Sequence, residues 1–191
     1  MMLPGRTESA LRVRPSAERD LGAISRVHLD AFGPVEGPEI VALVGELLRD
    51  ETAAPCLSIV AESDGTLVGH VLFTAVGIDS PSERPVASIL APLGVLREFQ
   101  RQGVGSLLVG RGLGILADRG VDLVFVLGHP TYYPRFGFQP AGRAGFDAPY
   151  PIPEENAAAW MVKALRPGAV DRFAGTVQCA AALSRPEHWK E

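Results

Sequence analysis

The amino-acid sequence predicts an α+β (mixed α/β) fold, on three observations. Apolar runs of strand length outnumber helical patterns in the first half of the chain, and a strand–helix–strand pattern follows over residues 86–127. Apolar residues make up 47% and charged residues 21% of the 191 residues, which is ordinary for a globular chain and excludes wholesale disorder. The early strands and the later strand–helix–strand pattern favour a mixed sheet with helices over a helical bundle or a β-sandwich.

The first fifty residues predict an arm, a strand and two helices. Residues 1–9 are polar with Pro and Gly and are expected to form a flexible arm. Residues 11–14 alternate apolar and basic, as a half-buried strand does. Apolar residues then recur at helical spacing over residues 16–32 and again over residues 39–50. The Gly- and Pro-rich residues 33–38 predict a break between these two helices.

The next stretch predicts a hairpin followed by a buried strand. Residues 57–62 and 67–76 have strand patterns, and Asp64 and Gly65 lie between them. An Asp-Gly pair favours a tight turn because both central residues must tolerate positive φ. Residues 86–96 are almost wholly apolar, as in a strand covered on both faces.

A helix over residues 104–119 and a second buried strand over residues 121–127 complete the strand–helix–strand pattern. The helix contains Gly110, Gly112 and Gly114, and each glycine costs about 1 kcal/mol relative to alanine in a helix interior. We therefore predict this helix although its glycine content disfavours helical structure.

The remaining third of the chain gives weaker patterns. Residues 129–136 predict a short Tyr-rich turn or helix, residues 157–165 fit either a strand or a helix, and residues 175–179 fit a last short strand. We expect one domain over residues 10–166 and an extension over residues 167–191 that packs on it.

Residues 100–106 carry the pattern most suggestive of chemistry. A buried strand ends, Gly103 and Gly105 let the backbone curl, and the following helix begins with unpaired amides. Such amides and the positive end of the helix dipole favour a phosphate or pyrophosphate, and Arg97 and Arg101 add positive charge. The Gly-Lys-Ser/Thr of a Walker loop is absent, and Leu108 stands where a dinucleotide fingerprint needs a third Gly or Ala.

Three features together resemble the GCN5-related N-acetyltransferase (GNAT) family. They are the strand end Leu93-Gly94-Val95-Leu96, the Gln-x-x-Gly-x-Gly pattern from Gln100 to Gly105, and the segment Tyr132-Tyr133-Pro134-Arg135-Phe136-Gly137-Phe138. The likeness runs from about residue 11 to about residue 165, and residues 126–140 look like the bacterial YhbS type. It implies a splayed, mostly antiparallel central sheet flanked by helices.

The resemblance also implies acetyl-CoA as cosubstrate and assigns its contacts. Backbone groups of the strand end would pair with the pantetheine arm, and amides of the loop would hold the pyrophosphate. The implied cofactor-binding residues are Leu93, Gly94, Val95, Gln100, Arg101, Gln102, Gly103, Val104, Gly105 and Ser106.

In such a family the acceptor amine attacks the thioester directly, and Tyr133 would protonate or hydrogen-bond the departing thiolate. Tyr133 precedes Phe138 by five residues, as the family's tyrosine does, whereas Tyr132 is expected to pack. Packing of Tyr133 in the core is the alternative. The segment departs from the family by beginning His129-Pro130. His129 is expected to cap the short helix, and a contact with the cofactor is the alternative.

The general base stays open at this point. His70, Ser88, Asp79 and Glu83 lie on or between the two middle strands, and a buried core histidine is the favoured interpretation of His70. A water relay is a further alternative. His28 and His188 show no ligand spacing, so no metal is expected.

The sequence limits partners and location without identifying the acceptor. Lys plus Arg number 18 against 22 Asp plus Glu, a formal charge of −4, which argues against a nucleic-acid binder. No apolar run has the length of a membrane span, and Cys56 and Cys179 have no metal-type spacing, so a cytoplasmic protein with reduced thiols is expected. Glu36, Glu39, Asp79 and Glu83 on two loops would suit a cationic small-molecule or protein amine.

Two other functions remain open from the sequence. A non-catalytic acyl-CoA sensor would explain why no base can be assigned, and a nucleotide-binding domain could use the same glycine turn. The oligomeric state is not indicated, with a dimer as one possibility.

Overall fold

The computed structural model describes residues 11–79 and 84–189, and the predicted arm over residues 1–9 lies outside them. Its strands form a sheet in the order β1-β2-β3-β4-β5-β8-β6, with β9 joined to β3 and β7 to β9. All pairs are antiparallel except β4 with β5 and β7 with β9. The strands are β1 (Arg12–Pro15), β2 (Leu57–Ser63), β3 (Thr66–Asp79), β4 (Ala87–Val95), β5 (Leu123–Leu127), β6 (Gln139–Pro140), β7 (Phe146–Asp147), β8 (Trp160–Ala164) and β9 (Gly175–Gln178).

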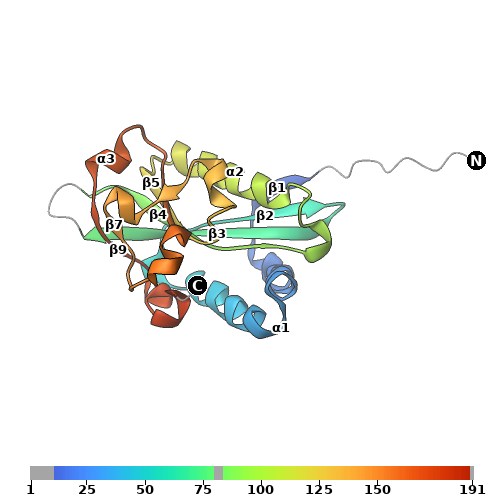
Figure 1. Ribbon diagram of the computed structural model, residues 1–191. Coiled ribbons are helices and arrows are strands. Elements are labelled where there is room, and N and C mark those ends of the chain that lie inside the picture. The colour runs from blue at the N-terminus through green and yellow to red at the C-terminus, as the bar shows by residue number, and fades with distance from the viewer. Residues whose placement is uncertain (1–10, 80–83, 190–191) are drawn as a thin grey trace, which may run out of the picture.

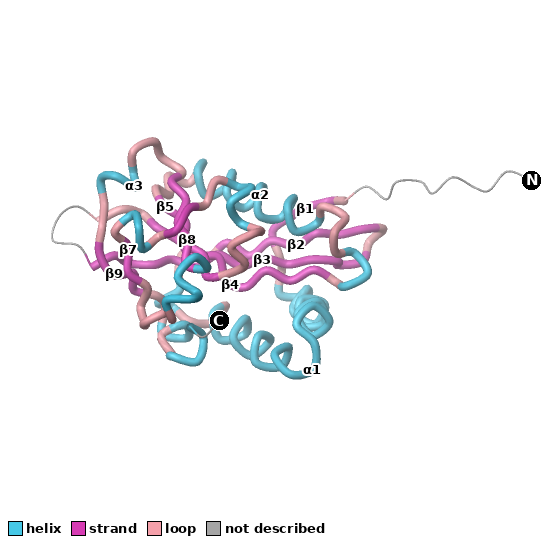
Figure 2. Tube along the Cα trace, in the orientation of Figure 1, coloured by secondary structure: helices cyan, strands magenta, loops and turns pink. Residues whose placement is uncertain are grey.

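Helices cover both faces of this sheet, which confirms the predicted fold class. The α-helices are α1 (Leu21–Leu47), α2 (Val104–Asp118) and α3 (Ala169–Arg172). α1 lies below the sheet and α2 above it in Figure 1, and Figure 2 shows the same three layers coloured by secondary structure. None of the helices in the described ranges combines the length and apolarity of a bilayer span.

The predicted hairpin is present. Asp64 and Gly65, with φ of 49° and 76°, make the turn between β2 and β3. β3 is longer than its apolar pattern because its last residues pair with β9, near the end of the chain.

The predicted break in the first helical region is a kink. Gly33 has φ 76° and ψ −173°, and helical structure resumes directly after it. Pro34 lies in the first turn of the second half, where a missing amide hydrogen costs nothing. The second half therefore begins at Pro34 and not at residue 39.

The sheet opens between β4 and β5. Their parallel pairing runs from Ala87 opposite Leu123 to Leu90 opposite Val126, and no described pairing continues beyond it. On the other edge of β4, Val71 faces Leu93 while Phe73 faces Leu90, so Ala91 and Pro92 oppose one residue of β3. This bulge bends β4 away from β5 and produces the expected splay.

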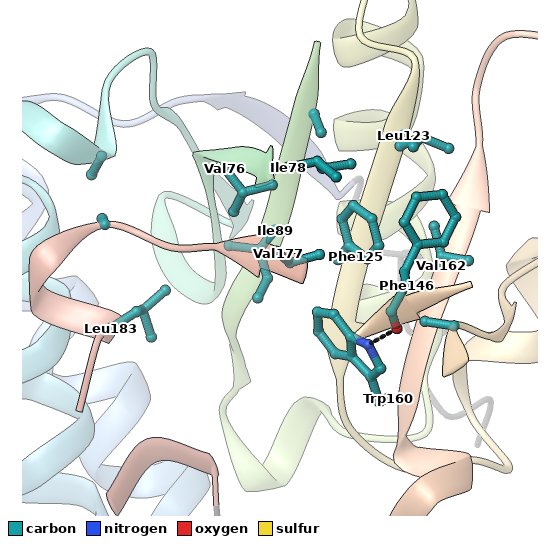
Figure 3. Close-up of a cluster of buried hydrophobic side chains, with 14 of the residues drawn as sticks. Val76, Ile78, Ile89, Leu123, Phe125, Phe146, Trp160, Val162, Val177 and Leu183 are labelled. Atoms are coloured by element: carbon teal, nitrogen blue, oxygen red, sulfur yellow. Dashed lines mark hydrogen bonds between the residues drawn. The ribbon is translucent and has the colours of Figure 1, made fainter. Parts of the chain in front are cut away.

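Apolar cores lie on both faces of the sheet. The core on the α1 face contains Phe125, Phe146 and Trp160. Trp160 Nε1–H donates to the Phe146 carbonyl at 3.0 Å, and this hydrogen bond is the dashed line in Figure 3. The core on the α2 face contains Phe73, Leu108 and Tyr133. Residues 157–165, which fitted either pattern, end in β8, so the strand alternative is correct for that part.

Candidate active site

A cleft of about 1370 Å³ lies where β4 and β5 separate. It is lined from the α1 face by residues of α1 and of the C-terminal turn η8 (Pro186–Trp189), and from the α2 face by the loop before α2 and by η4 (Tyr133–Phe136). The cleft therefore reaches both faces of the sheet.

The loop before α2 presents free backbone amides to this cleft. Gly103 is the N-cap of α2 with φ 86°, and Arg101 has φ 60°, so the backbone curls as the glycine pattern predicted. Among the described residues, none accepts a hydrogen bond from the amides of residues 101–106. Arg101 and Arg135 also line the cleft, so this end combines free amides with positive charge.

The end of β4 presents an open edge beside the loop. Leu96 donates its amide to Val68 of β3, and backbone groups alternate between the two edges of a strand. The backbone groups of Leu93 and Val95 therefore point toward the gap that β5 leaves. The Gln100 side chain donates to the Val95 carbonyl at 3.1 Å and fixes the loop to this edge.

The structure brings most of the predicted cofactor residues to one cleft but leaves three outside its lining. Gly94 faces α1, where a Cβ atom would lie 2.6 Å from His28 Nδ1. Val104 is 1% exposed in the α2 core. Gln102 is exposed and donates its side-chain amide to the Glu98 carbonyl at 2.6 Å. Lining residues among the predicted set are Leu93, Val95, Gln100, Arg101, Gly103, Gly105, Ser106 and Tyr133.

The two adjacent tyrosines both line the cleft but in different surroundings. Tyr133 is 7% exposed, and its ring lies so close to Gly128 that a Cβ there would be 2.6 Å from Tyr133 Cε2. Tyr132 is half-buried, lies under the Arg135 guanidinium at 4.5 Å and hydrogen-bonds Ser106. Burial raises the pKa of Tyr132, while the Ser106 hydrogen bond and the Arg135 charge oppose this. The sequence predicted only a packing role for Tyr132, but the residue also contacts the amide loop through Ser106.

The short helix begins under the His129 carbonyl, which accepts the Tyr132 amide at 3.0 Å. The N-cap of η4 is Tyr132 and no side chain caps it, so His129 is not the cap that the sequence suggested; His129 lines the cleft instead.

The α1 side of the cleft is acidic. Glu36 and Glu39 line it, as expected, together with Glu187 from the C-terminal turn. Asp79 instead pairs with Thr176 at the far end of β3, and Glu83 lies outside the described residues.

His70 is a buried core histidine, as the sequence favoured. It is 0% exposed, and its two ring nitrogens lie 2.9 Å from Ser58 Oγ and 2.8 Å from His28 Nε2. Ser88 is also buried, at 5% exposure, and does not line the cleft. No group of three potential metal ligands occurs within residues 11–79 and 84–189.

Sequence reasoning missed Arg135, Glu187 and His188 as cleft residues. Arg135 lies within the Tyr-rich segment and could have been noticed there. Glu187 and His188 reach the cleft only because the C-terminal segment folds back on α1, which no local pattern indicates.

Comparison with known proteins agrees with this geometry. Residues 12–141 match the family model of the acetyltransferase (GNAT) domain. The chain is 44% identical over 162 residues to the uncharacterized N-acetyltransferase YjhQ of Escherichia coli, covering 84% of this chain and 87% of that protein.

Two solved structures are similar over nearly the whole chain. The E. coli GNAT protein YhbS in complex with CoA superimposes with a TM-score of 0.81 at 28% identity, covering 93% of both chains. A GNAT acetyltransferase from Brucella melitensis in complex with acetyl-CoA gives 0.72 at 29% identity, covering 92% of this chain and 99% of that one.

Proposed function

The chain belongs to the GNAT family of acetyltransferases, and from this premise we propose that it moves an acetyl group from acetyl-CoA to a primary amine. The observation that carries the proposal is the set of free amides over residues 101–106 beside the open edge of β4, in a cleft that also contains Tyr133. The CoA complexes of the two similar structures support the same assignment.

The residues present fit this cosubstrate. Free amides at a helix N-terminus with Arg101 and Arg135 nearby suit a pyrophosphate. The outward-facing backbone of Leu93 and Val95 suits an extended amide-containing arm, which can add to the sheet as a strand would. Acetyl-CoA supplies the activated acyl group as a thioester.

The chain would then position the two substrates and supply the groups that move protons during the transfer. The cleft holds amine and thioester together, which lowers the entropic part of the barrier. We assign to Tyr133 the transfer of a proton to the departing thiolate; the support is that Tyr133 lines the cleft and that Gly128 leaves room for its ring.

The acidic α1 side indicates a cationic acceptor. Glu36, Glu39 and Glu187 would raise the local concentration of an ammonium group. Polyamines, aminoglycosides and lysine side chains belong to this chemical class.

The test is release of CoA thiol across a panel of primary amines that includes spermidine. We expect transfer by the native chain, and a fall in kcat of about 100-fold in Tyr133→Phe with a nearly unchanged KM for acetyl-CoA. Tyr150→Phe is the matched control, because that hydroxyl donates to the Ser184 carbonyl and its residue does not line the cleft.

Undiminished turnover in Tyr133→Phe would remove the proposed role of this tyrosine. Tight acetyl-CoA binding without transfer to any amine would instead favour the sensor interpretation.

A further inference from the structure

The C-terminal turn η8 is held firmly against the cleft. Arg185 Nη2 lies 2.8 Å from Glu46 Oε2 of α1, outside the cleft lining. Trp189 is 2% exposed, donates its Nε1–H to the Leu183 carbonyl at 2.9 Å and packs edge-on against Trp160. His188, one of the three residues between these anchors, is therefore fixed in the wall of the cleft.

His188 has a carboxylate beside one ring nitrogen and no hydrogen-bond partner at the other. Its Nδ1 lies 3.6 Å from Glu39 Oε1, and both residues line the cleft. The His188 side chain is 9% exposed. Its Nε2 is buried and has no hydrogen-bond partner within the described ranges. A buried polar atom without a partner is costly and calls for a functional explanation.

We propose that His188 is the general base that takes a proton from the acceptor amine, with Glu39 as its positioning residue. This inference rests on the proposed acetyltransferase function. A carboxylate beside Nδ1 favours the tautomer that carries its proton there, and this leaves the Nε2 lone pair for the substrate. His188 belongs to the α1 side of the cleft and Tyr133 to the α2 side, so base and acid approach from opposite faces of the sheet.

The proton balance closes with these two groups. The neutral amine forms a C–N bond to the thioester carbonyl carbon as the C–S bond breaks. One N–H proton passes to His188 Nε2, and the thiolate takes one proton from Tyr133. His188 later loses its proton to water and Tyr133 regains one, which leaves an amide and a free thiol.

Several carboxylates line the cleft together with His188. Glu39 and Glu36 lie on α1, Glu187 precedes His188, and Glu155 lines the cleft from η6 (Glu154–Ala159). Arg185, the neighbouring cation, is paired with Glu46. These carboxylates favour a cationic amine in the cleft.

The experiment compares native protein, His188→Gln, Glu39→Gln and Glu46→Gln with spermidine as acceptor at saturating acetyl-CoA. We expect kcat/KM for spermidine at pH 7 to fall about 100-fold in His188→Gln, with the KM for acetyl-CoA changed less than about twofold. Activity of this variant should rise with pH toward the pKa of a free amine, about 10, whereas native activity should level off earlier. Glu46→Gln removes the Arg185 ion pair but leaves the Trp189 anchor, Glu39 and His188 in place, so its pH profile should match the native one.

A second readout needs no acceptor. Nitrogen NMR of the imidazole should show the Nδ1–H tautomer of His188 in the native protein and a shift toward Nε2–H in Glu39→Gln. Transfer by native protein together with an unchanged pH profile in His188→Gln, or a predominant Nε2–H tautomer in the native protein, would overturn the inference alone. Failure of native protein to acetylate any amine would instead overturn the proposed function and the inference with it.

Discussion

At the scale of single residues, the buried histidine pair connects α1 to the centre of the sheet. His28 Nε2 meets His70 Nδ1 at 2.8 Å, and His70 continues through Ser58 to Ser16, whose hydroxyls lie 2.6 Å apart. Gly94 leaves the space that the His28 ring occupies. Both imidazoles are 0% exposed, so their charged forms are strongly disfavoured.

This pair should make folding sensitive to mild acid. Burial lowers the pKa of His28 to about 4, and burial with the nearby His28 lowers the pKa of His70 to about 3. The unfolded chain, with histidine pKa values near 6.5, binds more protons between these limits, so the contribution is complete above pH 6.5 and is lost as pH falls toward 4. From pH 7.5 to 5 we expect a loss of roughly 2 kcal/mol per histidine in the free energy of unfolding, measured by urea denaturation.

The exposed His129 provides the control for this prediction. His129→Gln should retain the pH dependence of stability, whereas a His28→Gln/His70→Gln double variant should have a shallower one. Equal stability of the native protein at pH 7.5 and pH 5 would contradict the burial argument.

Individual site residues differed in how far the sequence could predict them. The glycine spacing predicted the turn at Gly103, because a positive φ of 86° favours glycine at that position whatever the rest of the fold. The sequence did not indicate the proposed role of His188, because that role depends on a contact with Glu39, 149 residues earlier in the chain. Local spacing patterns cannot reveal such a contact.

At the scale of elements, α2 shows why a glycine-rich helix is stable here. Its three interior glycines lower its intrinsic helix propensity, yet α2 runs unbroken from Val104 to Asp118. A Cβ at Gly112 would lie 2.6 Å from Phe73 Cζ, so this glycine lets the helix approach β3. Packing of the α2 face onto the sheet therefore compensates for the poor propensity.

Gly112→Ala should consequently destabilise the protein although alanine favours helices. The added methyl group would force Phe73 from its position, and overpacking of this kind costs about 1–3 kcal/mol. Gly110→Ala is the matched control, because a Cβ there meets nothing within 4 Å, and it should stabilise by about 0.5–1 kcal/mol. Urea denaturation of both variants measures the difference, and stabilisation by Gly112→Ala would refute the packing argument.

The other elements could be predicted where their cause is local in the sequence, and not where it is a contact with a distant strand. The Asp64-Gly65 turn was predictable because the turn requires those residues locally. The boundary between η6 and β8 could not be predicted, because β8 begins at Trp160 through its pairing with Leu127 of β5, which is distant in the sequence. The bulge at Ala91 and Pro92 had an overlooked signal, since proline in a sheet interior marks an irregularity.

At the scale of the whole molecule, the cleft is a product of the sheet rather than of one motif. The bulge in β4 separates the strands, and the cleft is lined by the loop before α2 and, on the other face, by α1 and the C-terminal turn. α2 lies above the sheet and α1 below it in Figure 1. A ligand spanning the gap would contact both layers. Its binding energy should therefore stabilise the entire fold rather than one segment.

Acetyl-CoA should raise the thermal unfolding midpoint in a concentration-dependent way. At 100 times its Kd, binding adds about 2.7 kcal/mol, which for a chain of this size corresponds to roughly 5–10 °C. ATP or NAD at the same concentration should give a far smaller shift, because neither supplies an arm for the open edge of β4. Gly103→Ala should reduce the shift, since alanine is strained at φ 86° and would disturb the amide loop without meeting a neighbour within 4 Å. An equal shift with ATP, or an undiminished shift with acetyl-CoA in Gly103→Ala, would show that the amide loop and the open strand edge do not form the cosubstrate site.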